Sequence, residues 1–495
     1  MANCENCEQR CAQLDEKWPD AVTLASISAQ LIARFVEIVG AANALLRPED
    51  QAGYLREWRD LYVGKTAVVL RPGSTDEVAK ILALANAERI GVVPQAGNTG
   101  LVGGQIPSAD GSQIVLSVER LNRVRDVDAA AGTMIVEAGM TLADVQAAAD
   151  HAGRLFPLSL ASEGSARIGG VVATNAGGTA VLAYGNARQL TLGLEAVLAD
   201  GRVWHGLRRL KKDNTGYDLR DLLIGSEGTL GIITAASLKL VPKPAELATA
   251  VVALDTPETV LNFFRHAEAL AGGALTTFEF WGAGIHDFAL RFMPGARDPF
   301  TVSYPWYALI ELSSGYADGR VDADLQSLLL RASESGLIRD AAVAQSLQQR
   351  RDFWALREGF SEAQKGAGGS IKHDISVPVG RVPEFMSRAA ELVERVCPGA
   401  RPVPFGHFGD GNVHYNVSQP AGMSKADYLA QWDTMTSAVH DLVAAMGGSI
   451  SAEHGIGQMK REALLRSKSA VELDMMRAIK KALDPNGILN PGKLL

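Results

Sequence analysis

The chain has 495 residues, which is too long for one compact core, so its length predicts two or three domains. Its residues are 47% hydrophobic and 21% charged, the proportions of an ordinary folded soluble protein. The net charge of −8 argues against a nucleic-acid-binding protein, although it is compatible with a local basic pocket. No apolar run reaches the roughly 18 residues of a membrane-spanning helix.

The first twenty residues, MANCENCEQRCAQLDEKWPD, contain early acidic residues and no apolar core segment. Neither a secretory signal nor a transit peptide fits this composition, so we expect a cytoplasmic protein. Cys4, Cys7 and Cys11 are spaced closely enough for a cluster or zinc site, but no fourth ligand lies nearby. We therefore favour a reduced, frayed tail over a metal site.

Residues 21–48 are predicted to form one or two helices ahead of the first domain. The stretch 67–100 then follows the order strand, turn, helix, strand and glycine-rich loop. Ser74 or Thr75 is expected to cap that helix, because a Glu follows in the first turn.

Two short strands are predicted next, at 113–118 and 133–139, followed by a helix from about residue 141 to 152. Residues 190–206 have the pattern of a hairpin that turns at Asp200-Gly201. Together these segments predict mixed helix and sheet in the first half of the chain.

The pattern changes after Pro242 and Pro244, which mark a domain boundary. Beyond it strands alternate with helices, which favours an α+β domain with an antiparallel sheet. The predicted strands are 247–254 and 306–313, and the predicted helices are 257–272, 321–336 and 343–365. The last 25 residues predict a helix that stops at Asp-Pro-Asn-Gly, followed by an extended end.

Three glycine-rich loops occur in the first half, at 94–104, 168–178 and 225–232. None of them matches a Walker loop or a Rossmann fingerprint. Successive backbone N–H groups in such loops can converge on phosphate oxygens. One loop alone would fit an active-site lid equally well. Three loops without an adjacent cationic cluster favour a long pyrophosphate ligand that the backbone holds.

The segment FGHFGDGNVH begins at residue 405 and contains two histidines. Asp410-Gly411 is a strong signal for a two-residue hairpin turn. That turn would place His407 directly opposite His414, with Cβ atoms roughly 5 Å apart. Two imidazoles at that separation can bind one metal ion. The hairpin alone leaves a surface turn with incidental histidines equally open.

Several segments, in order, resemble one known family. The chain is similar to FAD-linked D-2-hydroxyacid dehydrogenases, of the D-2-hydroxyglutarate and D-lactate dehydrogenase type, in the vanillyl-alcohol oxidase superfamily. The resemblance extends from about residue 50 to 495. The segments are PQAGNTGLVGG, SEGSARIGGVVATNAGG, NTGYDLRDLLIGSEGTLGIIT, GHFGDGNVHYN, SAEHGIGQMKRE and LDPNGILNPGKLL.

The resemblance implies an α+β protein with four parts. Residues 1–54 would form an N-terminal helical segment, and 55–243 an FAD-binding domain of two α+β subdomains. Residues 244–445 would form an α+β substrate- and metal-binding domain with an antiparallel sheet. Residues 446–495 would be a C-terminal segment that returns to the flavin.

The resemblance also implies the residues that bind FAD. The pyrophosphate would lie on Gly97, Asn98, Thr99 and Gly100, with Pro94 and Leu101 nearby. The flavin and its ribityl chain would be lined by Ser162, Gly169, Asn175, Gly177, Gly178 and Gly185; Glu227, Gly231 and Ile232 would meet the adenine end or adjoining backbone; and Asn490 would reach the flavin ring. Turn geometry is the alternative role for several of these glycines. The loop at 94–104 contains no histidine, so we expect non-covalent FAD.

A third metal ligand lies in the segment SISAEHGIGQMK. There Glu453 and His454 are adjacent, so an extended backbone points them to opposite sides. The resemblance gives the carboxylate to the metal and the imidazole to the substrate, with His454 as general base. His407, His414 and Glu453 would then form a site with open positions, suited to zinc or another divalent ion.

Substrate capture requires fixed cations in an acidic protein. Arg357 and Ser361 are one turn apart on a predicted helix, hence on one face, and Arg can bind a carboxylate bidentately. Lys372 matches the carboxylate-binding lysine of the family. Asn416 lies on the face of His414 by side-chain alternation. A surface salt bridge is the alternative role for Arg357.

The expected reaction is FAD- and metal-dependent oxidation of D-2-hydroxyglutarate to 2-oxoglutarate, by hydride transfer from C2 to flavin N5. D-lactate or another D-2-hydroxy monocarboxylate is the alternative substrate. A non-catalytic flavoprotein subunit and a plain metal-binding protein are the alternatives from other classes.

The expected electron acceptor is an electron-transfer flavoprotein or a quinone, because no NAD fingerprint is visible. Neither a nucleic-acid partner nor a membrane span is expected. A homodimer is the assembly considered, but the sequence leaves the oligomeric state and the identity of the metal open.

Overall fold

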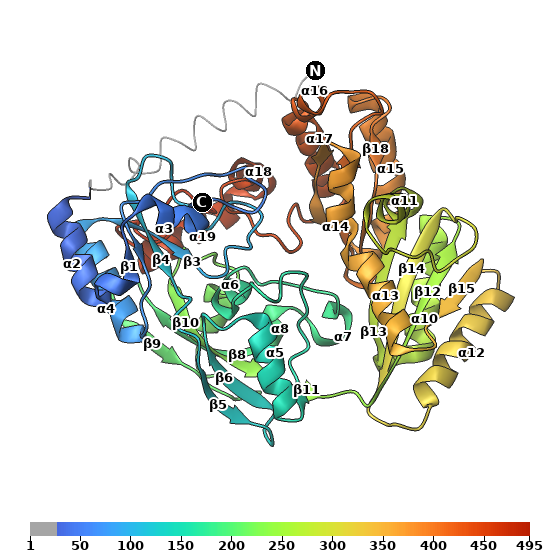
Figure 1. Ribbon diagram of the computed structural model, residues 1–495, viewed down its shortest axis with the longest axis horizontal. Coiled ribbons are helices and arrows are strands. Elements are labelled where there is room, and N and C mark those ends of the chain that lie inside the picture. The colour runs from blue at the N-terminus through green and yellow to red at the C-terminus, as the bar shows by residue number, and fades with distance from the viewer. Residues whose placement is uncertain (1–26) are drawn as a thin grey trace.

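The computed structural model describes residues 27–495. The three N-terminal cysteines lie outside the described residues, as does the start of the predicted N-terminal helix. Two lobes lie side by side, one formed by the blue to green elements and the other by the yellow to orange elements (Figure 1). Among the described residues, no helix is both long and apolar enough to cross a membrane.

The first lobe begins with a four-stranded sheet in the order β1-β2-β4-β3. Strands β2, β4 and β3 are parallel, and the helix α4 makes the crossover from β2 to β3. Ser74 caps α4 by accepting the N–H of Glu77, which confirms one of the two expected caps. The elements are α2 (Ala29–Val39), β1 (Ala44–Leu45), α3 (Pro48–Leu55), β2 (Val69–Leu70), α4 (Thr75–Glu88), β3 (Gly91–Gln95) and β4 (Gln113–Ser117).

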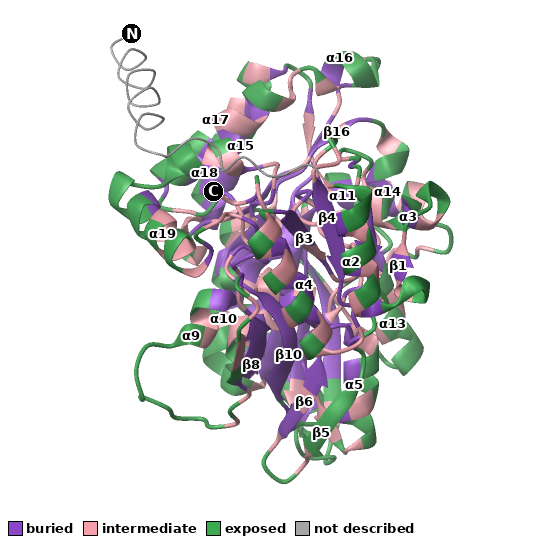
Figure 2. Ribbon diagram, turned by 90° about the vertical axis from the view of Figure 1, so that its left-hand side faces the viewer, coloured by how far each residue is buried: buried purple, intermediate pink, exposed green. Residues whose placement is uncertain are grey.

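A five-stranded antiparallel sheet completes the first lobe in the order β5-β6-β10-β8-β9. Its central strands are buried, and the helices around them expose their outer faces (Figure 2). The expected hairpin turns at Gly201, where φ is +85°. The elements are β5 (Val124–Asp128), β6 (Thr133–Glu137), α5 (Leu142–His151), β7 (Arg154–Leu155), α6 (Ile168–Ala173), α7 (Val181–Tyr184), α8 (Ala187–Leu190), β8 (Thr191–Val197), β9 (Val203–Gly206), α9 (Leu219–Leu223), β10 (Ile232–Lys239) and β11 (Val241–Pro242).

The second lobe is built on a seven-stranded antiparallel sheet in the order β15-β12-β14-β13-β19-β20-β17. Both of its faces are covered. Along β12, Ala250 and Val252 enter one core, whereas Val251 and Ala253 enter the other, as the alternation of a strand requires. The strands are β12 (Glu246–Leu254), β13 (Leu275–Gly282), β14 (Trp306–Ser314), β15 (Asp340–Val343), β17 (Asp374–Ser376), β19 (Phe405–His407) and β20 (Asn412–His414).

Helices pack on both faces of this sheet. On one face lie α10 and α12, and on the other α11 and α14. The predicted helix 343–365 begins only at Leu347, because Ser346 caps it, and it is interrupted at Gly359. The helices are α10 (Pro257–Ala271), α11 (Ala283–Phe292), α12 (Arg320–Glu334), α13 (Leu347–Glu358), α14 (Phe360–Ala363), α15 (Val382–Val396), α16 (Lys425–Leu429) and α17 (Trp432–Ala445). A small sheet joins β16 (Ser370–Ile371), β21 (Val417–Ser418) and β18 (Arg401–Pro402).

The C-terminal residues leave the second lobe and pack on the first. Helices α18 (Arg461–Ser467) and α19 (Ala470–Leu483) lie beside the blue elements of the first lobe (Figure 1). Leu489 bridges in parallel to Val92 of β3, and the N–H of Asn490 donates to the Val92 carbonyl. The chain end is thereby joined to the strand that precedes the first glycine loop.

Phe408 lies in the turn between β19 and β20, is fully buried, and its ring contacts Phe264, Phe278 and Phe280. We expect Phe408→Ala to lower the free energy of unfolding of this lobe by about 3–5 kcal/mol, because the vacated volume cannot fully collapse. Urea unfolding of the purified protein measures the change. Leu330→Ala, at a 60% exposed position of α12, should stay within about 0.5 kcal/mol of wild type. Equal effects of the two variants would contradict the assignment of Phe408 to the core.

Candidate active site

Three side chains that the sequence assigned to a metal come together between the lobes. His407 ends β19, His414 ends β20, and Glu453 lies in the loop before α18. The Nε2 of His407 lies 3.7 Å from Oε1 of Glu453, and the Nε2 of His414 lies 3.7 Å from Oε2. Both imidazoles therefore turn the same nitrogen toward one carboxylate.

The register of the hairpin differs from the prediction. His407 pairs with Asn412, and His414 pairs with Phe405, so the two histidines are diagonal rather than directly opposed. The turn has four residues, because Phe408 is drawn into the aromatic core and only Gly411 has a positive φ, +77°. The rings still meet, with centroids 5.6 Å apart, since diagonal neighbours share a face of the sheet.

Two buried carboxylates lie behind the histidines. The Nδ1 of His407 is 2.6 Å from Oε1 of Glu279, and the Nδ1 of His414 is 3.7 Å from Oδ1 of Asp374. A carboxylate on the far nitrogen orients an imidazole and fixes the tautomer that binds a metal. Two histidines and a carboxylate, backed in this way, fit a divalent metal ion such as zinc.

Asp374 was missed by the sequence analysis, although it adjoins the site directly. Within residues 27–495, ligand atoms of Asp374, His414, Glu453 and His454 all lie within 4.8 Å of one another. His407 is outside that group. The available signal for Asp374 was an acidic residue at the start of the short strand DIS, and Glu279 is an acid within the otherwise largely apolar strand LTTFEFWG.

His454 lies beside the three candidate metal ligands. Its ring stacks on that of His414, with centroids 6.0 Å apart. Its Nδ1 is 3.6 Å from Oδ2 of Asp374, the oxygen that also accepts the backbone N–H groups of Glu453 and His454 at 2.9 Å. Burial lowers the pKa of His454 to about 4, although Asp374 opposes the change. The imidazole is therefore neutral at pH 7 and able to accept a proton.

The other pKa shifts reflect the crowding of ionisable groups. Burial alone would lower the pKa of His407, but the carboxylates of Glu279 and Glu453 outweigh it and raise this pKa to about 9. Burial raises the pKa of Glu453 to about 7, against the attraction of His407. The pKa of His414 is lowered by burial, although Asp374 opposes the change.

The residues expected to bind substrate occupy different environments. Arg357 is buried at the end of α13, where its guanidinium pairs with Glu279 at 2.6–2.9 Å. Ser361 is exposed on α14, beyond the interruption of the helix, so the expected common face of Arg357 and Ser361 is absent. Asn416 is buried and donates from Nδ2 to Gln364. Glu279 pairs with both Arg357 and His407, so a single carboxylate separates this arginine from the candidate metal ligand His407.

Lys372 is a half-buried cation without a partner. Its ammonium group makes no hydrogen bond or ion pair with any residue between 27 and 495. Burial lowers its pKa to about 8, and the neighbouring charges of Arg59 and Lys365 add to the decrease. At pH 7 the group is still protonated, so it is available to a carboxylate from outside the chain.

The three glycine loops of the first lobe contact one another. A Cβ on Gly97 would lie 2.0 Å from the carbonyl oxygen of Ser165, and a Cβ on Gly228 would lie 2.4 Å from the ring of Pro94. The N–H of Glu227 donates to the Ala173 carbonyl at 2.8 Å. Such close approach is available only to glycine, and tightly packed glycine loops can present backbone N–H groups as a cradle.

Four of the predicted cofactor residues have a left-handed backbone although they are not glycine. Asn98, Asn175, Glu227 and Asn490 have φ between 45° and 53°. Strain of this kind clusters at ligand sites. Nδ2 of Asn490 donates to the carbonyls of Gly104 and Glu227, whereas its buried Oδ1 has no partner among the described residues.

The other predicted cofactor residues lie in the same loops or next to them. Gly177 faces the candidate metal ligand Glu453, since a Cβ on this glycine would lie 2.7 Å from Oε1 of Glu453. The carbonyls of Gly100, Leu101 and Ser162 accept hydrogen bonds within the lobe. Placed by position alone are Pro94 in β3, Thr99 in the first loop, Gly169 in α6, Gly178 and Gly185 around α7, and Gly231 and Ile232 at the start of β10.

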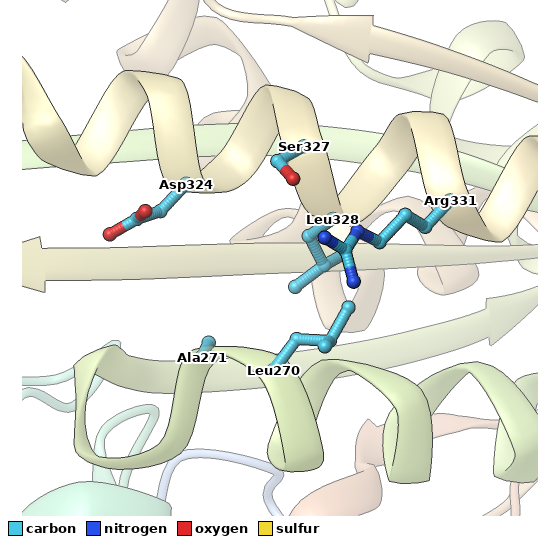
Figure 3. Close-up of a pocket in the computed structure, with 6 residues that line it drawn as sticks. All are labelled: Leu270, Ala271, Asp324, Ser327, Leu328 and Arg331. Carbon is cyan, nitrogen blue, oxygen red and sulfur yellow. The ribbon is translucent and has the colours of Figure 1, made fainter.

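A cavity of about 750 Å³ lies where the second and third glycine loops meet the segment 444–468. Thr174, Asn175, Gly225 and Glu227 line it from the first lobe, and Glu453 lines it from the other side. This volume is in the range of cofactor sites. The cradle, the cavity and the unpartnered Asn490 oxygen together fit FAD. A second cavity, of about 150 Å³, lies between α10 and α12 and contains none of the predicted residues (Figure 3).

Comparison with known proteins agrees with this geometry. A family model described as "FAD binding domain" matches residues 66–206, and one described as "FAD linked oxidases, C-terminal domain" matches residues 243–494. P-cresol methylhydroxylase with substrate bound has a similar structure, with a TM-score of 0.76 over 95% of this chain and 98% of that chain. Its sequence is 15% identical, so this likeness concerns the fold alone.

Two relatives are similar over almost the whole chain. D-2-hydroxyglutarate dehydrogenase, mitochondrial, of Arabidopsis thaliana is 37% identical over 471 residues, which are 95% of this chain and 82% of the relative. D-2-hydroxyglutarate dehydrogenase of Xanthomonas citri pv. viticola is 38% identical over 458 residues, which are 92% of this chain and 95% of the relative. The α+β architecture predicted from the sequence is confirmed. The chain therefore belongs to the FAD-linked D-2-hydroxyacid dehydrogenases and is an FAD-dependent oxidoreductase.

Proposed function

We propose that this protein oxidises D-2-hydroxyglutarate to 2-oxoglutarate at a site that contains FAD and a divalent metal. The observation that carries the proposal is the convergence of His407, His414 and Glu453, with His454 stacked alongside. The glycine loops that fit FAD adjoin this site through Gly177. The names of the relatives from Arabidopsis thaliana and Xanthomonas citri support the choice of substrate.

Each group has one role in the proposed reaction. A divalent ion, when bound, supplies Lewis acidity that lowers the pKa of the substrate hydroxyl. Non-covalent FAD, when bound, supplies the acceptor for the hydride from C2. His454 takes the hydroxyl proton, because its imidazole is neutral and its Nδ1 faces the buried carboxylate of Asp374. That carboxylate stabilises the imidazolium that forms.

Cations beside the site would hold the substrate carboxylates. Lys372 supplies an unpaired ammonium group, and Arg357 remains a candidate although Glu279 now shares its charge. Ser361 and Asn416 stay candidates for hydrogen bonds to the same carboxylates. The two carboxylates of D-2-hydroxyglutarate could each bind to members of this set. The single carboxylate of D-lactate would use only part of it, which favours D-2-hydroxyglutarate over D-lactate.

The further assignments extend this proposal. Zinc is the metal that suits the ligand set best. An electron-transfer flavoprotein or a quinone would reoxidise the flavin, a homodimer is the assembly to test, and the cytoplasm is the expected location. The Arabidopsis relative is named mitochondrial, whereas the name of the Xanthomonas citri relative gives no compartment.

His407→Ala and His414→Ala should each lose the metal and the activity together while keeping FAD, because the hairpin lies outside the glycine loops. Metal analysis and a dye-reduction assay measure the two losses, and the flavin absorbance spectrum measures the FAD that is kept; acid should release the flavin from wild type and variants alike. His151→Ala, at an exposed position at the end of α5, is the matched control and should behave as wild type. Retained metal with full turnover would disprove the assigned ligands.

His454→Ala should lower kcat by roughly 10²–10⁴ with metal and FAD still bound, because the proton acceptor is lost while Glu453 remains. Steady-state kinetics of dye reduction, with metal and flavin contents measured on the same sample, provides the check. Normal turnover of this variant would exclude His454 as the base.

Lys372→Ala should act mainly on KM for D-2-hydroxyglutarate, since a carboxylate clamp contributes to binding in both ground and transition states. The loss of a charge-assisted hydrogen bond costs on the order of 1.5–3 kcal/mol, roughly 10–150-fold. Lys365→Ala, which removes a neighbouring exposed cation, is the control and should change KM far less. A higher kcat/KM for D-lactate than for D-2-hydroxyglutarate in the wild type would refute the proposed substrate but not the chemistry.

A further inference from the structure

The loop that carries Glu453 and His454 is docked onto the first lobe. The N–H groups of Gln458 and Met459 donate to the carbonyl of Val102, at 2.9 and 3.2 Å. The side-chain amide of Gln458 donates to the carbonyl of Gly103 at 2.8 Å. Val102 and Gly103 belong to the first glycine loop, so the residues after His454 rest directly on a loop that we assign to FAD.

Glu227 makes the strongest of these contacts. Its two carboxylate oxygens accept the N–H groups of Ile456 and Gly457, both at 2.7 Å, across 229 and 230 residues of sequence. The side chain is 9% exposed, and its backbone is held at φ +53°. The Asn490 amide donates to the Glu227 carbonyl at 2.8 Å, which holds this conformation in place. The strained backbone of Glu227 is held by hydrogen bonds at both its side chain and its carbonyl, and strain of this kind clusters at functional sites.

A second carboxylate holds the same loop from the other lobe. Oδ2 of Asp374 accepts the N–H groups of Glu453 and His454, both at 2.9 Å. The metal-binding carboxylate and the proposed base thus lie between two carboxylates, Asp374 in the second-lobe sheet and Glu227 among the flavin loops. Charge-assisted hydrogen bonds of this kind are shorter and stronger than neutral ones.

We propose that Glu227 is a positioning residue that sets the place of Glu453 and His454, and through them the affinity for the metal. Both of its carboxylate oxygens are engaged by the loop, which is two to four residues from the reacting groups. This inference rests on the proposed function, since it concerns the same metal site. It adds a residue of the flavin domain that controls the metal without touching it.

The test compares Zn²⁺ affinity and flavin content in Glu227→Gln. An amide presents one acceptor and one donor where two N–H groups converge, so one of the two bonds is lost. We expect the Kd for Zn²⁺, measured by competition with a chromophoric chelator on the FAD-loaded protein, to rise about 10–100-fold. Because Glu227 also lines the cavity that fits FAD, the FAD content is measured on the same sample and the Kd refers to the FAD-loaded fraction.

Glu57→Gln is the matched control. Glu57 is 1% exposed in the same lobe and accepts two backbone N–H groups, from Arg59 at 2.7 Å and Leu61 at 2.6 Å, within its own segment. Its loss should cost similar stability but leave the Kd for Zn²⁺ within about 2-fold of wild type. Equal loss of affinity in both variants would show a general structural effect and would overturn the proposal.

Gly455→Ala provides a second variant should Glu227→Gln fail to fold. Gly455 has φ +80°, and a Cβ on it would lie 2.8 Å from Oε1 of Glu227, so the substitution displaces the loop from an intact carboxylate. The same decrease in Zn²⁺ affinity with FAD retained is expected. Wild-type Zn²⁺ affinity in either folded variant would overturn the proposal, as would loss of FAD with unchanged Zn²⁺ affinity. A Zn²⁺ affinity of the His407→Ala variant equal to that of wild type would instead disprove the metal site of the proposed function.

Discussion

The buried carboxylate of Glu279 is the constraint on which the arrangement of the candidate metal ligands depends. It is 1% exposed in the middle of the second-lobe sheet and pairs with both Arg357 and His407. Burial raises the pKa of Glu279, but these two partners outweigh it and hold the pKa below its usual value. Removing one partner from such a group costs about 3–5 kcal/mol. Because the Nδ1 of His407 lies against the carboxylate of Glu279, the Nε2 of the same ring faces Glu453.

The candidate site combines two side chains on strands of the second-lobe sheet with two side chains on a loop. The two histidines end neighbouring strands of a sheet that is covered on both faces, and strand ends are accurate platforms for ligands. Glu453 and His454 lie instead on a loop, whose position depends on hydrogen bonds to Asp374 and Glu227 from opposite lobes. This loop, held from both lobes, connects the candidate metal ligands to the glycine loops proposed for FAD.

Much of the fold follows from local signals in the sequence. The Ser74 cap and the turn at Gly201 were found where the sequence predicted them, because a cap or a tight turn is decided by a few adjacent residues. Two strands of the second lobe, β12 and β14, were recognisable from their apolar runs, whereas the similarly long β13 was not predicted. The hairpin register was wrong, because the burial of Phe408 lengthened a turn that Asp410-Gly411 alone would have made shorter.

By itself the sequence determined the family, the α+β architecture and the set of histidines, acids and glycine loops from which a site could be built. The tertiary structure decided which of these side chains meet. Glu279 and His407 are 128 residues apart, and Glu227 and Ile456 are 229 apart, so no local spacing could indicate either pair. It also decided that Arg357 is paired with Glu279 whereas Lys372 has no partner among the described residues. The physical reason is that pairing between buried charges depends on which strands and loops are neighbours in space, and packing of the whole chain sets those neighbours.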